Sequence, residues 1–156
     1  FVRDALAKGY ITPYYGGEMW RPLVDIRDVA KAYIVCLEAE EDKVGGEIFN
    51  LVYRNFRISE LALRVRVALK KSGLDVDIRP DYRYKGVRSY RVSGEKIKTR
   101  LGFIPAISVE DSVVDMVDKI TAYGLRNFDD PIYYNINWLQ TLEKADEIIK
   151  ITGRIF

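Results

Sequence analysis

The side chain best suited to bind a phosphate in this sequence is that of Arg21, because of the residues around it. It follows a pair of glycines, Gly16 and Gly17, and it opens a short apolar run over Pro22–Ile26. An arginine at the start of a strand, after a glycine turn, can direct its planar guanidinium into a cleft and hold a phosphate through two parallel hydrogen bonds. The alternative is a solvent-exposed arginine on an edge strand, and the spacing alone leaves both interpretations open.

A second group of candidate ligands lies between Arg79 and Arg100, where eight basic residues stand against two acidic ones. Tyrosines alternate with the basic residues there, for example around Arg83, Arg88 and Tyr90. This excess of positive charge indicates a site for an anion. The anion is either the phosphate of a small molecule or an unpaired nucleic acid, whose bases could stack on the aromatic rings. A solvated basic loop is the third interpretation.

The sequence excludes several common kinds of active site. It has no histidine, and therefore lacks the usual general base, the usual metal ligand and the Ser-His and Cys-His nucleophile pairs. With Cys36 as the single cysteine, neither a zinc site nor an internal disulfide is expected. None of the eleven tyrosines is followed by a lysine four residues later. We therefore expect no catalytic residue and no metal site in this chain.

The composition is that of an ordinary globular domain, with 48% apolar and 31% charged residues. No apolar stretch approaches the length of a bilayer span, so no membrane segment is expected. The net charge of +2 favours neither nucleic acid nor an acidic surface as a general partner. The single cysteine fits a reducing, cytoplasmic setting.

Periodicity and turn residues predict a mixed α/β unit with a helical tail. Phe1–Lys8 reads as the end of a helix, and about five further helices are expected: 28–40, 59–71, 93–101, 108–120 and 138–150. Short strands are expected at 22–26, 47–52 and 76–80, and the largely apolar Glu47–Val52 has the composition of an interior strand of a parallel sheet. The helix over 28–40 carries four apolar residues at helical spacing: Val29, Tyr33, Ile34 and Leu37.

Two aspartates near the start of this helix have different predicted roles. Asp28 is expected to be its N-cap, and Asp25 is expected to form local hydrogen bonds around Arg27. Further along, Ser108 and Asp111 have the spacing of a capping box, which predicts the start of the next long helix.

The order of these motifs resembles that of the extended short-chain dehydrogenases/reductases, the NAD-dependent nucleotide-sugar epimerases and dehydratases. Members carry Gly-x-Gly-x-x-Arg before an apolar strand and an Asp-Val-Ala helix, which Arg21 and Asp28–Ala30 match. Asn50 matches the asparagine of a Phe-Asn-x-Gly signature whose glycine is absent here, and Leu101–Pro105 matches a Leu-Gly-Phe-x-Pro ending. The resemblance, to enzymes similar to UDP-glucose 4-epimerase, covers about Phe1–Ala122.

The resemblance implies a fold and a division of labour. The fold is α/β, the C-terminal, substrate-binding portion of an extended Rossmann-type epimerase formed by residues 1–124, with 125–156 as a helical C-terminal extension. In the family the NAD fingerprint and the catalytic Tyr-x-x-x-Lys precede this region, so NAD belongs to an N-terminal half that is missing here. The chain alone is then expected to be inactive, as a fragment of an epimerase (an isomerase) or a dehydratase (a lyase).

The resemblance also assigns the substrate contacts. Arg21 would bind the diphosphate of a nucleotide sugar, and Arg83 and Arg88 would do so from the loop that closes over the nucleotide. Tyr90 is the aromatic candidate in that loop, where family members place such a residue near the ribose. Asn50, at the end of an expected strand, either contacts the ligand or bonds to neighbouring backbone.

Three partners follow from this interpretation. They are a nucleotide-diphosphate sugar, the chain's own N-terminal half, and a second copy that would pair with the open edge of the strand expected at 47–52. The alternative function is a non-catalytic module that binds RNA or single-stranded DNA through residues 79–100, and a steep salt dependence would distinguish it.

Overall fold

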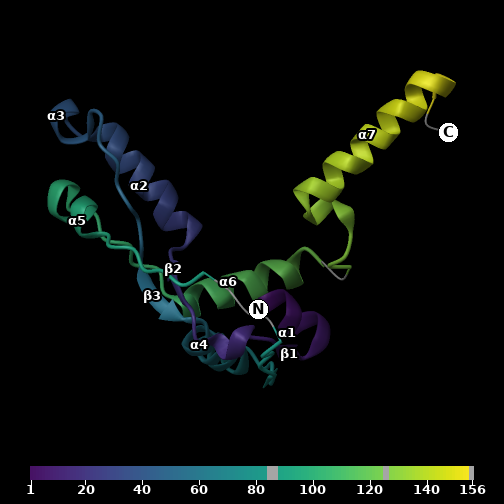
Figure 1. The fold of residues 1–156 in the computed structure, drawn as a ribbon, viewed down its shortest axis with the longest axis horizontal. Coiled ribbons are helices and arrows are strands. Elements are labelled where there is room, and N and C mark those ends of the chain that lie inside the picture. Colours follow the sequence, from purple (N-terminus) through teal and green to yellow (C-terminus); the bar gives the residue numbers. More distant parts are fainter. Residues whose placement is uncertain (84–87, 125–126, 155–156) are drawn as a thin grey trace. The chain divides into compact units, whose positions relative to one another are not determined.

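The structure is a computed structural model that describes residues 1–83, 88–124 and 127–154. These residues form two compact units, Phe1–Ile120 and Thr121–Phe156, each described here by itself. The described part of the chain contains seven α-helices (Figure 1): α1 Val2–Lys8, α2 Ile26–Glu38, α3 Glu41–Val44, α4 Ile58–Lys71, α5 Glu95–Leu101, α6 Val109–Ala122 and α7 Asn135–Thr152. The predicted helices are present, and the short α3 is an addition to them.

The strands of the first unit form two small two-stranded sheets. In one, β1 (Tyr10–Ile11) runs parallel to β4 (Asp77–Ile78), and the pairing continues through a bridge between Tyr14 and Asp81. In the other, β2 (Trp20–Leu23) runs antiparallel to β3 (Arg54–Arg57). The first sheet therefore brings the start of the basic loop beside the segment that leads to Arg21.

The strand expected over Glu47–Val52 is not formed. These residues connect α3 to β3 without a ladder partner in the described part of the chain, and Ile48 is 81% exposed. An apolar run becomes an interior strand only where neighbouring strands take up its N–H and C=O groups. Because no such neighbour lies there, composition alone gave the wrong prediction for this segment.

The hydrophobic core of the first unit lies between α1, α4 and α6 and the strands β1 and β3. On α6 the buried positions recur every four residues, at Val109, Val113 and Val117, as the sequence period predicts. The other large apolar side chains that are most completely buried are Ile11, Phe56 and Leu69. Phe56, a residue of β3, belongs to this core and therefore attaches the β2–β3 sheet to it.

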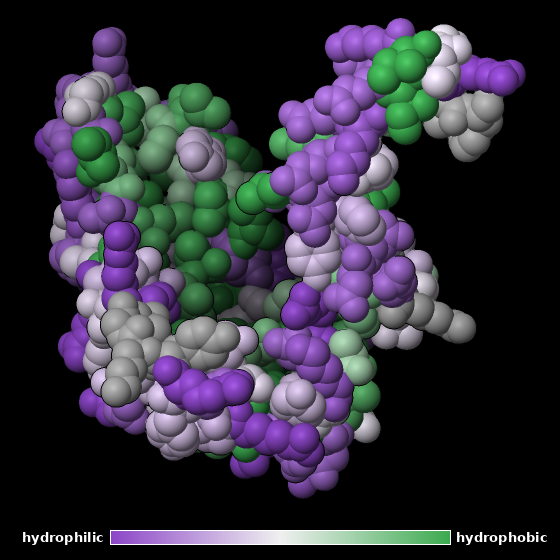
Figure 2. Space-filling view, turned by 45° about the vertical axis from the view of Figure 1, so that its right-hand side comes forward, coloured by the Kyte–Doolittle hydropathy of each residue, from purple (hydrophilic) through white to green (hydrophobic). Residues whose placement is uncertain are grey.

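Helix α2 turns most of its predicted apolar stripe toward solvent. Tyr33, Ile34 and Leu37 are 69%, 53% and 84% exposed, whereas Asp28 and Ala32 are buried. Figure 2 shows hydrophobic side chains gathered over a broad area of the part of the first unit that carries α2 and α5 in Figure 1. Large exposed apolar areas of this kind mark surfaces that bind another protein, a membrane or a ligand.

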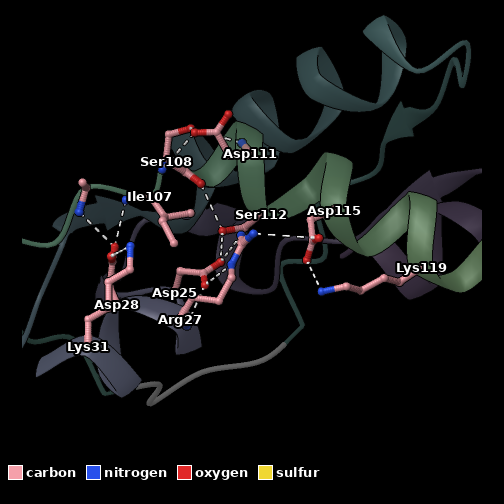
Figure 3. A network of polar contacts seen from close by, with 11 residues as sticks. Asp25, Arg27, Asp28, Lys31, Ile107, Ser108, Asp111, Ser112, Asp115 and Lys119 are labelled. Atoms are coloured by element: carbon pink, nitrogen blue, oxygen red, sulfur yellow. Dashed lines mark hydrogen bonds and ion pairs between the residues drawn. The ribbon is translucent and has the colours of Figure 1, made fainter. Parts of the chain in front are cut away.

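The first turn of α2 corrects the predicted role of Asp28, which is not the N-cap, whereas Asp25 bonds to Arg27 as predicted. The N-cap is Asp25, whose carboxylate accepts a hydrogen bond from the N–H of Arg27 at 2.9 Å. Asp28 is almost completely buried and accepts hydrogen bonds from the N–H groups of Ala106 and Ile107 at 2.9 and 2.8 Å (Figure 3). It therefore fastens α2 to the segment that leads into α6.

The second unit consists of a short 3₁₀ turn, Pro131–Tyr133, and helix α7. The hydroxyl of Tyr134 donates a hydrogen bond to the carbonyl of Phe128 at 2.8 Å, which closes the loop before the helix. Among the described residues, no helix combines the length and the apolarity that a bilayer crossing requires.

Candidate functional site

A left-handed turn sets the position of Arg21. Tyr15, Gly16 and Gly17 have φ values of +53°, +62° and +80°, which fold the chain back before β2. A Cβ atom on Gly17 would lie 2.6 Å from the backbone nitrogen of Ser59, so only glycine allows the turn to sit against the start of α4. The turn is followed by β2, the strand that contains Arg21, and so sets the position where this strand begins.

The guanidinium of Arg21 is held by two backbone segments and an aromatic ring. Its Nη1 donates to the carbonyl of Trp20 at 2.8 Å and to the carbonyl of Arg88. Its Cζ lies 5.2 Å from the centre of the Tyr90 ring, a cation–π contact. Three of the predicted site residues, Arg21, Arg88 and Tyr90, thus lie together.

Residues 88–92 run beside the β2–β3 sheet. The hydroxyl of Ser89 accepts from the N–H of Trp20 at 3.0 Å, and the guanidinium of Arg91 stacks over the Trp20 ring at 3.8 Å. At the far end, the side-chain amide of Asn55 exchanges two hydrogen bonds with the backbone of Val92. No local sequence pattern points to Asn55, because its partner is 37 residues away.

Arg83 is placed by its neighbour Asp81. Its backbone N–H donates to that carboxylate at 2.9 Å, and its guanidinium pairs with it at 2.7 Å. These hydrogen bonds from Arg83 lower the pKa of Asp81. The Arg83 side chain is 87% exposed, and a Cβ on Gly16 would lie 2.6 Å from the Tyr82 ring, so this segment packs against the turn before Arg21.

Two parts of the prediction lie elsewhere. Asn50 is an exposed residue of the connection between α3 and β3, and it does not line the pocket beside Arg21. Residues 84–87, which belong to the predicted basic loop, lie outside the described residues.

A pocket of about 400 Å³ opens beside Arg21, within the range of roughly 300–1,000 Å³ that is typical of small-molecule sites. Polar groups from Asp4, Thr12 and Tyr14 share its wall with the arginine. The remaining lining residues are apolar: Phe1, Met19 and Ile58. A cation, hydrogen-bonding groups and an aromatic ring around one pocket can receive a ligand with an anionic group and a flat ring.

A separate polar network joins α2 to α6 (Figure 3). The guanidinium of Arg27 pairs with Asp25 at 2.8 Å and lies 3.8 Å from Asp115, while the hydroxyl of Ser112 donates to Asp25. The hydrogen bond from Arg27 holds the pKa of the Asp25 carboxyl well below its usual range, despite the opposing effect of burial. Asp25 thus forms the local hydrogen bonds with Arg27 that the sequence predicts. A carboxylate this firmly ionised is suited to fastening elements, not to accepting protons.

The described residues do not form a site that fits a metal ion or a dinucleotide. Within the described residues, no group of three or more Cys, Asp or Glu side chains converges as metal ligands would. The glycines of the sequence do not form a Gly-x-x-Gly-x-x-Gly run. The Gly16–Gly17 turn leads into strand β2, whereas a dinucleotide phosphate site needs a helix N-terminus after the glycines.

Comparison with known proteins gives a family match over the first third of the chain. Residues 1–51 match the sequence model of the NAD dependent epimerase/dehydratase family. This stretch contains Arg21, the start and body of α2, and Asn50. No curated protein matches the sequence.

Solved structures share the fold at low sequence identity. UDP-glucuronic acid 4-epimerase from Bacillus cereus, in complex with UDP-glucuronic acid and NAD, has a TM-score of 0.63 at 21% identity over 78% of this chain and 38% of its own. L-threonine dehydrogenase from Clostridium difficile has a TM-score of 0.63 at 19% identity, over 80% of this chain and 40% of its own. dTDP-glucose 4,6-dehydratase from Bacillus anthracis, in complex with NAD, has a TM-score of 0.59 at 21% identity, over 78% and 37%.

The chain therefore spans about two fifths of the length of the solved structures that it matches. The α/β fold predicted from the sequence is confirmed: it is the fold of part of a Rossmann-type epimerase/dehydratase. NAD is the cofactor of the family whose model matches residues 1–51, as the resemblance implied.

Proposed function

We propose that this chain is the substrate-binding portion of an NAD-dependent nucleotide-sugar epimerase or dehydratase, and that its ligand is a nucleotide-diphosphate sugar. The observation that carries the proposal is the arrangement around Arg21. Its guanidinium is oriented by the carbonyls of Trp20 and Arg88 and by the Tyr90 ring, at the wall of a pocket of about 400 Å³.

The charge around Arg21 supports a ligand with more than one negative charge. Arg83 lies on the segment that packs against the turn before Arg21, and Arg88 lies on the segment whose carbonyl holds it. Arg83 is paired with Asp81, and the carboxylate of Asp4 lies in the pocket wall, so the positive charge that would favour a diphosphate over a single phosphate comes from Arg21 and Arg88. Tyr90 would then lie beside the ribose, whereas any contact of Asn50 with the ligand would be made outside the pocket beside Arg21.

The chemical contribution of the chain would be to position its ligand. Binding energy from a diphosphate grip orients the sugar toward a reacting group and converts a bimolecular step into one within a complex. The sequence carries no Tyr-x-x-x-Lys pair. We therefore expect residues 1–124 to bind substrate without transforming it, and 125–156 to form a helical extension.

The proposal includes a partner that supplies NAD. The chain spans about two fifths of the matching structures, and the stripe of α2 with Tyr33, Ile34 and Leu37 faces solvent. Ile48, in the segment that lacks a strand partner, is exposed as well. An α/β half with the NAD site would cover this surface, and a second copy of the chain is the alternative occupant.

Calorimetric titration with UDP tests the substrate proposal. We expect Arg21→Ala to weaken UDP binding about tenfold or more, because it removes a charge-assisted hydrogen-bond donor from the pocket. Arg66→Ala is the matched control: it removes an equal charge from an exposed position on α4. Equal affinity of the two variants for UDP, or stronger binding of L-threonine than of UDP, would contradict the proposal.

The second candidate, a nucleic-acid module, is favoured by one observation. Two arginines lie near the Trp20 ring, with the Cζ of Arg57 at 5.5 Å and that of Arg91 at 3.8 Å from its centre, and single-stranded nucleic acid binds to such groups of cations and aromatic rings. Binding of a single-stranded oligonucleotide that falls steeply with salt and does not compete with UDP would favour this candidate.

A further inference from the structure

We propose that Asn55 is a positioning residue for the site around Arg21. Its side-chain amide fixes residues 88–92 against the β2–β3 sheet, and this segment in turn holds Arg21. The inference rests on the proposed function, because it assigns a role within the same site.

The contact between Asn55 and Val92 reproduces a pair of backbone hydrogen bonds. The Asn55 Nδ2 donates to the Val92 carbonyl at 2.9 Å, and its Oδ1 accepts from the Val92 N–H at 2.9 Å. Two neighbouring strands exchange the same donor and acceptor where they form a hydrogen-bonded pair. The amide therefore binds residues 88–92 as an additional strand would.

The neighbouring strand explains why a side chain performs this role. Asn55 lies opposite Pro22 in the β2–β3 register, and proline has no N–H to donate. At the other end of the segment, Tyr90 donates to the Trp20 carbonyl at 3.4 Å and Ser89 accepts from the Trp20 N–H. A backbone ladder that begins at Trp20 cannot continue past Pro22, and Asn55 supplies the next attachment.

The attached segment carries the groups that orient Arg21. The carbonyl of Arg88 accepts from its Nη1, and the ring of Tyr90 lies 5.2 Å from its Cζ. If residues 88–92 detach from the β2–β3 sheet, Arg21 loses both contacts and its long side chain gains rotamer freedom. Ordering that side chain again would then oppose ligand binding.

Two substitutions separate positioning from general stability. Asn55→Ala removes both hydrogen bonds, and Asn55→Asp keeps the shape but replaces the donor with an oxygen that faces the Val92 carbonyl. Val113→Ala is the matched control: this valine is 2% exposed in the core, so the change destabilises the fold without touching residues 88–92.

The first measurement uses Trp20 as a reporter of the segment. The chain has two tryptophans, and Trp138→Phe leaves Trp20 as the one that remains. In this background we expect both Asn55 variants to shift the Trp20 emission to longer wavelength, because the indole loses the Arg91 guanidinium that covers it and gains water. The Val113→Ala variant should keep the parent emission.

The second measurement is UDP affinity at a temperature at which all variants are folded. We expect about tenfold weaker binding for Asn55→Ala and Asn55→Asp, and a change within about twofold for Val113→Ala. Unchanged emission and unchanged affinity in Asn55→Asp would overturn the inference, and so would an equal loss of affinity in Val113→Ala.

The two proposals fail in different ways. If the parent chain does not bind UDP, the substrate proposal fails, and Trp20 emission together with amide exchange of residues 88–92 still decides the role of Asn55. Faster exchange and shifted emission in the Asn55 variants then support its attachment of the segment. Parent-like values in both measurements overturn it.

Discussion

At the scale of single residues, the sequence predicts hydrogen bonds between close neighbours in the chain but not those between distant segments. Ser108 and Asp111 form the capping box that their spacing predicts: the Asp111 N–H donates to the Ser108 hydroxyl at 3.1 Å, and the Ser108 N–H donates back to the Asp111 carboxylate at 3.3 Å. Both partners lie within one turn, so the sequence contains the whole interaction.

Asp28 and Asn55 show the opposite case. The partners of Asp28 are 78 and 79 residues away, and the partner of Asn55 is 37 residues away. A local pattern made Asp28 a helix cap, although its carboxylate in fact accepts from Ala106 and Ile107. Burial of a carboxylate without compensation would cost several kcal/mol, and here those two N–H groups, with Lys31 at 3.8 Å, supply the compensation. The sequence alone does not show that they do.

The acidic network at the start of α2 predicts a pH dependence of stability. The folded pKa of Asp25 lies below its unfolded value, so the stabilisation is full above the unfolded pKa and is lost as pH falls through the folded one. We expect Asp25→Asn to lower the free energy of unfolding by about 2 kcal/mol at pH 7, through loss of the ion pair with Arg27 and a weaker N-cap.

Urea unfolding at several pH values checks this expectation. The stability difference between the parent chain and Asp25→Asn should shrink as the pH is lowered from about 5 toward 2, because the unfolded parent then binds a proton at this carboxylate that the folded parent does not. Asp118→Asn, at an exposed position of α6, is the control and should change stability by less than about 0.5 kcal/mol. A difference that stays constant with pH would contradict the assignment.

At the scale of elements, helices were more predictable than strands. The caps and periods of α1, α5 and α6 are local, and Gly9 and Gly102 end two of these helices in the left-handed conformation expected of them. Glu47–Val52 has the composition of a strand but no neighbour in the described residues to pair with. The helix stripe at Tyr33–Leu37 likewise lacks a covering element. Both departures come from partners outside the segment, which no local pattern contains.

The outward face of α2 predicts self-association of the isolated chain. Leu37 is 84% exposed and Ile48 is 81% exposed, so lysine at either position should change the free energy of unfolding by less than about 0.5 kcal/mol. Removal of exposed apolar area should at the same time weaken association between copies. Sedimentation velocity over a range of concentrations measures this effect.

The pattern of the two variants distinguishes the surfaces involved. If Leu37→Lys alone suppresses association, the face of α2 is the contact; if Ile48→Lys alone does so, the contact is the segment that was expected to be a strand. Ala32→Lys is the control for damage to the helix, because Ala32 is buried and its replacement should unfold the unit. Association that is unaffected by both exposed substitutions would contradict a role for either surface.

At the scale of the whole molecule, the core and the proposed site belong to the first unit. The buried apolar residues that form the core all lie between Val2 and Val117, and the pocket beside Arg21 is lined by residues from Phe1 to Ile58. None of these groups comes from the described residues 127–154. We therefore expect the boundary proposed at residue 124 to separate a part with its own core from a helical segment, in which large apolar side chains such as Ile136 and Leu139 are exposed.

A chain that ends at Gly124 tests this division. We expect it to unfold cooperatively in urea with a free energy within about 1 kcal/mol of the longer chain, because every core residue in the described part of the chain is kept. Its affinity for UDP should also be unchanged, since Arg21, Arg88 and Tyr90 remain with the segments that hold them. Loss of cooperative unfolding, or an affinity loss of about tenfold, would mean that residues 125–156 complete the fold or the site, and that they are not a separate extension.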